Sequence, residues 1–71
     1  MSELCFVAVM RGNEEWTLGI VKDGERGYYR MDYPTVKTAA EAENWARTSN
    51  ERMGISEKEE KEMVLKSMSG D

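Results

Sequence analysis

The chain has 71 residues, of which 39% are hydrophobic and 34% charged, a composition typical of one small folded domain and not of a disordered segment. The net charge of −4 argues against general binding to phosphate backbones, and the absence of histidine removes the commonest general base and metal ligand. The single cysteine, Cys5, cannot form an internal disulfide, so we expect a cytoplasmic protein. No apolar run approaches the length of a membrane span.

The first two predicted strands form a hairpin. Residues 4–10 are a short apolar run with β-branched and aromatic side chains, and a second strand is expected at about 16–22. Between them, Gly12-Asn13 is typical of a two-residue II′ turn, because glycine suits its first position. That turn would place Val9 opposite Trp16.

A third strand, at about 26–33, is predicted to continue the antiparallel meander. Asp23-Gly24 lies between two β-prone runs, which is the strongest short-range signal for a two-residue hairpin turn. The register that follows from this turn places Tyr28 opposite Gly19. A one-residue slip would exchange the two faces of the sheet.

The second half of the chain predicts two helices, at about 39–53 and 57–68. Each begins with a capping box, Thr38 to Glu41 and Ser56 to Glu59, and Gly54 is placed to end the first helix. We therefore expect an α+β fold, in which a three-stranded antiparallel β-meander is followed by two helices packed on one sheet face. The whole chain, 1–71, is expected to be a single domain.

The predicted core lies between one face of the sheet and the helices. The sheet residues assigned to it are Cys5, Val7, Val9, Trp16, Leu18, Ile20, Tyr29 and Met31. The helix residues assigned to it are Ala42, Trp45, Ala46, Met53, Val64 and Met68.

The opposite sheet face is the predicted interface, because two helices cover only one face and an uncovered apolar patch commonly marks an interaction site. Its residues are Phe6, Ala8, Met10, Val21, Arg26, Tyr28 and Arg30. Aromatic residues, methionine and arginine are enriched in protein interfaces, so a protein partner or a homodimer is expected. Two alternatives remain: a plain half-solvated face in which Tyr28 covers Gly19, and nucleic-acid binding by stacking on Phe6 and Tyr28. The acidic net charge disfavours nucleic acid.

An acidic patch is the second candidate surface. Its residues are Glu57, Glu59, Glu60 and Glu62. The patch could contact a basic, nucleic-acid-binding protein, and the alternative is a solvated helix face with carboxylates favourably placed near the helix N-terminus.

The sequence contains no motif for catalysis, for cofactor binding or for metal binding. No glycine-rich phosphate loop and no Cys/His metal spacing is present, and neighbouring carboxylates such as Glu14 and Glu15 point apart in regular structure. Cys5 is expected to be a small buried apolar residue and not a nucleophile. We therefore expect that the protein is not an enzyme.

Part of the helical half resembles small accessory proteins of tailed bacteriophages and prophages, among which are the anti-CRISPR proteins. The resemblance rests on Asn50, on Gly54-Ile55-Ser56, and on Val64 followed by Ser67-Met68. It covers about half the chain and assigns no functional residues. It implies a non-enzymatic protein, found in a bacterial host cell, that inhibits or modulates a host or phage protein through direct contact.

Overall fold

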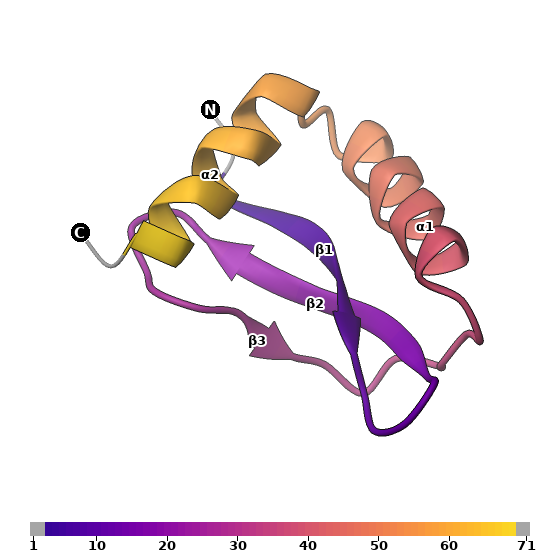
Figure 1. Ribbon diagram of the computed structural model, residues 1–71. Coiled ribbons are helices and arrows are strands. Elements are labelled where there is room, and N and C mark those ends of the chain that lie inside the picture. The colour runs from indigo at the N-terminus through magenta and orange to yellow at the C-terminus, as the bar shows by residue number, and fades with distance from the viewer. Residues whose placement is uncertain (1–2, 70–71) are drawn as a thin grey trace.

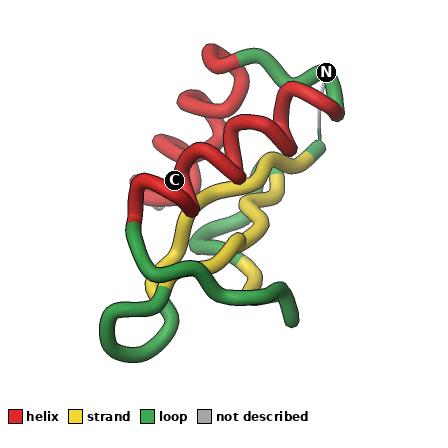
Figure 2. Tube along the Cα trace, turned by 90° about the vertical axis from the view of Figure 1, so that its right-hand side faces the viewer, coloured by secondary structure: helices red, strands yellow, loops and turns green. Residues whose placement is uncertain are grey.

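The computed structural model describes residues 3–69 and contains three strands followed by two helices (Figure 1). These elements are β1 (Leu4–Met10), β2 (Trp16–Lys22), β3 (Tyr29–Arg30), α1 (Ala39–Arg52) and α2 (Glu57–Ser69). The strands form one antiparallel sheet in the order β1-β2-β3, and both helices pack against it. The helices lie together on one side of the strands in Figure 2. The predicted α+β fold is confirmed.

Both helices begin at the predicted capping boxes. The hydroxyl of Thr38 accepts a hydrogen bond from the backbone N–H of Glu41 at 3.1 Å, and that of Ser56 accepts one from Glu59 at 3.2 Å. Each bond satisfies a backbone donor that has no partner within its own helix.

The end of α1 forms a Schellman motif, in which two backbone hydrogen bonds run back across the last turn. The N–H of Ile55 donates to the carbonyl of Asn50 at 2.9 Å, and that of Gly54 donates to Glu51 at 3.0 Å. Gly54 has φ +76°, the left-handed conformation that this motif requires. The motif turns the chain so that Ile55 is buried in a core cluster with Cys5, Val21 and Met63.

The predicted register between the first two strands is wrong by one residue. Trp16 pairs with Met10 and not with Val9, and the N–H of Arg11 donates to the carbonyl of Glu15 at 2.8 Å. The connection is therefore longer than a two-residue turn, and Glu14 adopts φ +60° within it. Because every position of residues 4–10 is apolar, either face of β1 can pack against the core, so its sequence does not determine the register.

The third strand is also shorter and shifted. Gly19 pairs with Arg30 and not with Tyr28, and only Tyr29–Arg30 are paired where a strand of residues 26–33 was predicted. The N–H of Gly27 donates to the carbonyl of Ser67 in α2 at 3.1 Å and not to β2. The turn is therefore displaced, and Gly27 lies outside the sheet.

After β3 the chain leaves β2 and returns to it once. Val36 exchanges two backbone hydrogen bonds with Trp16, of 2.7 and 2.8 Å. In the segment between Arg30 and Val36, the hydroxyl of Thr17 donates to the carbonyl of Pro34 at 2.9 Å. The bond satisfies the carbonyl of Pro34 and the buried hydroxyl of Thr17 where no ladder hydrogen bond is made.

The register shift changes the membership of the core. Val21, predicted on the outer face, is buried, and so is Thr17, which was not assigned to the core. Trp16 and Ile20 are only half-buried. Four residues assigned to the core are exposed: Tyr29, Met31, Met53 and Met68. Asn50, which the prediction omitted, is the largest fully buried side chain.

Candidate functional site

The structure brings the seven residues of the predicted interface together only in part. Ala8, Met10, Val21 and Tyr28 line one hollow beside α2, and Phe6, Arg26 and Arg30 lie outside it. Partners across an antiparallel ladder point to the same side, so the shifted register places Val21 and Arg30 with Val7 and not with Phe6. Val21 is buried in the core, and Arg26 lies in the turn between β2 and β3. Whether individual members contact a partner stays a prediction.

Phe6 and Tyr28, the proposed stacking pair, lie in different surroundings. Phe6 is half-buried and its ring contacts Tyr33, with centroids 6.5 Å apart; Tyr33 in turn contacts Trp45 of α1 at 6.0 Å. Tyr28 is 48% exposed and lies over Gly19, where an added Cβ would come within 3.2 Å of Tyr28 Cδ2. Tyr28 therefore lies against Gly19, as one of the two alternatives to an interface had it, although Gly19 pairs with Arg30.

An apolar groove lies between the sheet and the C-terminal half of α2, with a volume of about 400 Å³. Its lining residues are Val7, Ala8, Val9, Met10, Val21, Gly27, Tyr28, Val64, Ser67 and Met68. Three of these are large and exposed: Met10 at 53%, Tyr28 at 48% and Met68 at 77%. We call this site the α2 groove.

Hydrogen bonds fix the end of the α2 groove where the turn after β2 meets α2. The N–H of Gly27 donates to the carbonyl of Ser67 at 3.1 Å, and the hydroxyl of Ser67 donates to the carbonyl of Val64 at 2.8 Å. Because this polar side chain is satisfied within its own helix, it adds no unpaired hydroxyl to the apolar lining. The groove is therefore a preformed apolar surface.

Two arginines extend the same sheet face beyond the α2 groove. Arg11 follows Val7 and Val9 at the two-residue spacing of a strand, and Arg30 pairs with Gly19 beside Tyr28. Both arginines line a second hollow, of about 230 Å³, with Thr17, Met31 and Asp32. We call Arg11 and Arg30 the arginine shelf.

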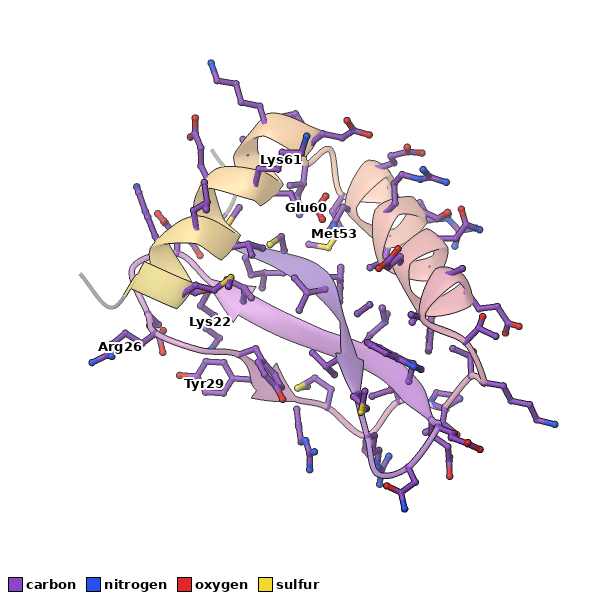
Figure 3. The ribbon with its side chains drawn as sticks, in the orientation of Figure 1. Lys22, Arg26, Tyr29, Met53, Glu60 and Lys61 are labelled. Carbon is purple, nitrogen blue, oxygen red and sulfur yellow. The ribbon has the colours of Figure 1, made fainter. Side chains whose placement is uncertain are left out.

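The predicted acidic patch is divided by local contacts. Glu57 and Glu62 are exposed, whereas Glu59 takes part in the capping box with Ser56. Glu60 is half-buried and lies on the side of α2 that faces α1, where it lines a polar cleft of about 530 Å³ (Figure 3). The cleft also contains Arg47 and other residues of α1, so its charge is mixed. The four carboxylates do not form a single exposed surface.

Cys5 is buried, as expected, and burial raises the pKa of its thiol to about 11, with a smaller contribution from the carboxylate of Glu60. At neutral pH the sulfur is therefore a protonated thiol and a poor nucleophile. Among residues 3–69, no group of three or more Cys, Asp or Glu side chains is placed to hold a metal ion. No helix in this part of the chain is long and apolar enough to cross a membrane.

Comparison with protein families, curated proteins and solved structures finds no match to this chain. The site is therefore defined by its geometry alone. The sequence prediction missed Arg11. It did place Val64 and Met68 of α2 against the sheet, but as core residues and not as the lining of an open groove. The spacing of Val7, Val9 and Arg11 was the available signal, but it identifies a shared face only once the register is known.

Proposed function

We propose that this protein is a small non-enzymatic binding module that holds an apolar segment of another protein in the α2 groove. The observation that carries the proposal is the open apolar groove with three exposed side chains, Met10, Tyr28 and Met68, in its lining. Exposed apolar patches on small proteins commonly mark interaction sites. Methionine adapts its shape to different partners, and tyrosine contributes a rigid contact area.

The lining of the α2 groove favours a segment of a protein over a compact cofactor. Its side chains are apolar apart from the phenol hydroxyl of Tyr28 and the hydroxyl of Ser67, and the latter is already bonded to Val64. A small-molecule site normally adds several convergent polar groups that fix the ligand's orientation. A groove beside a helix instead suits the apolar face of a second helix, whose side chains enter at i, i+3 or i+4, and i+7.

The test is an NMR titration of the isotopically labelled protein with a synthetic amphipathic peptide of about 14 residues. Isolated helices shorter than this are only marginally stable in water. The peptide carries leucine at i, i+3 and i+7 and glutamine on its polar face. We expect chemical-shift changes to concentrate at Val7, Val9 and Tyr28.

Two variants of α2 make the test specific. Met68 and Leu65 are both exposed apolar residues of α2, but only Met68 lines the groove. Met68→Ser should weaken peptide binding several-fold, whereas Leu65→Ser should leave it unchanged. If both variants bind equally well, or if the shifts map elsewhere, the α2 groove is not the binding site.

The proposal retains the function class inferred from the sequence but moves the site. The predicted inhibition or modulation of a host or phage protein stays a proposal, and binding in the α2 groove is compatible with it. Nucleic-acid stacking is not carried forward, because Phe6 contacts Tyr33 and does not share a face with Tyr28.

A further inference from the structure

We infer that the partner segment is acidic as well as amphipathic, with its apolar side chains in the α2 groove and its carboxylates on the arginine shelf. This inference rests on the proposed function of the groove. It reverses the charge expected of a partner for a protein whose own net charge is −4.

The first observation is the placement of the basic side chains. Arg11 and Arg30 lie on the groove's own sheet face and line the adjacent hollow together. Arg26, which precedes Gly27 of the groove, is exposed and extends outward from the turn near the end of α2 (Figure 3). Two arginines thus share the hollow beside the groove, and a third lies in the turn next to Gly27.

The second observation is the placement of the acidic side chains near this surface. Asp32 lines the shelf hollow, and Glu25 accepts a hydrogen bond from the hydroxyl of Tyr29. Glu15, the partner of Arg11 across the hairpin, lines a different hollow, beside Trp16. The four carboxylates of the predicted acidic patch lie in the first two turns of α2, away from the end of the helix that lines the groove.

These placements give the groove and shelf an apolar half and a cationic half. Arginine matches carboxylates well because its planar guanidinium donates two parallel hydrogen bonds. A helix with leucines on one face and glutamates along its border would complement both halves. A helix bordered by lysines would place like charges against Arg11 and Arg30, which disfavours binding.

The test compares three peptides that share the leucine spacing used above and differ only in the polar positions, which are Gln, Glu or Lys. We expect the Glu peptide to bind roughly 3- to 10-fold more tightly than the Gln peptide, the range for two partly exposed ion pairs. Added salt should reduce this difference because it screens exposed charges. The Lys peptide should bind less tightly than the Gln peptide.

Charge-removing variants assign the effect to the shelf. In the double variant Arg11→Gln/Arg30→Gln, the Glu and Gln peptides should bind equally. Arg47→Gln is the matched control, because Arg47 is an exposed arginine of α1 that lines the cleft between the helices. If Arg47→Gln removes the preference and the shelf variant does not, the inference is wrong.

The outcomes separate this inference from the proposed function. Equal binding of all three peptides in the groove would overturn the acidic partner and leave the apolar groove in place. Failure of all three to bind would overturn both. A single-stranded oligo(dT) probe that binds through Arg11, Arg30 and Tyr28, more tightly than the Glu peptide does, would replace the acidic helix with nucleic acid. Light scattering that shows a dimer dissociated by Met68→Ser would assign the groove to a second copy of the chain.

Discussion

The side-chain amide of Asn50 pairs with both backbone polar groups of Phe6. The N–H of Phe6 donates to Asn50 Oδ1 at 2.7 Å, and Asn50 Nδ2 donates to the carbonyl of Phe6 at 3.0 Å. Phe6 lies on β1, an edge strand whose outward N–H and C=O groups would otherwise have no strand beside them. One residue of α1 therefore makes the two hydrogen bonds that a neighbouring strand would make.

We expect Asn50→Ala to destabilise the fold by about 2–4 kcal/mol, because it leaves two partly buried backbone groups unpaired. Urea denaturation followed by tryptophan fluorescence measures this change. Asn44→Ala is the control: Asn44 is an exposed asparagine of the same helix, and its change should stay within about 0.5 kcal/mol. Equal effects of the two substitutions would mean that the contact with Phe6 contributes nothing measurable.

Gly19→Ala should destabilise the sheet by about 1–3 kcal/mol through overpacking. The added Cβ would lie 2.9 Å from Val9 Cγ1 and 3.2 Å from Tyr28 Cδ2, closer than such atoms pack. A double-mutant cycle with Val9→Ala isolates the clash, because the smaller side chain gives the new methyl group room. The penalty of Gly19→Ala should be smaller in the Val9→Ala background; an unchanged penalty would exclude this clash as its cause.

Gly54→Ala should lower stability by about 1–2 kcal/mol because of backbone conformation alone. Gly54 has φ +76°, and no atom lies within 4 Å of the position of an added Cβ, so the substitution meets strain but no clash. Gly54→Asn should cost less, since asparagine tolerates this conformation better. Thermal unfolding of the three proteins tests that order, and equal midpoints would contradict it.

Cys5 should resist alkylation by iodoacetamide at pH 8 in the native protein and react readily in denaturant. Burial is the main cause of the rise in its pKa from 9.0 to about 11, so the native thiol stays protonated at this pH. Above pH 9 the unfolded chain loses this proton first, and the contribution of Cys5 to stability therefore falls as the pH rises towards about 11. Cys5→Ala should remove this part of the pH dependence; rapid alkylation of the native protein would contradict the burial.

The helix boundaries could be predicted because their signals are local. Thr38, Ser56 and Gly54 each act through backbone groups within a few residues, so a short sequence window contains the whole interaction. The sheet register could not be predicted in this way. It depends on which side of an entirely apolar β1 faces α2, and on the bond between Gly27 and Ser67, which are far apart in the sequence.

The candidate site shows the same division. Burial of Cys5 follows from residue type and was predicted correctly. The contact of Tyr28 with Gly19 was only one alternative, and it rested on a cross-strand pairing that the structure does not have. The role of Asn50 was missed, because a polar residue on a helix gives no sign that it faces a strand edge. Arg11 was likewise missed, since it lies just outside the predicted strand of residues 4–10.

The hydrogen bond between Gly27 and Ser67 makes the α2 groove depend on contacts between distant parts of the chain. The groove's floor comes from β1 and β2 and one wall from the last turns of the chain, so it exists only after the most distant parts of the sequence have met. A ligand in the groove would bind the completed fold and not a species in which α2 is detached. Binding would therefore hold α2 in place. In a hydrogen-exchange experiment, occupancy of the groove should slow the exchange of the α2 amides before it slows that of the β1 and β2 amides.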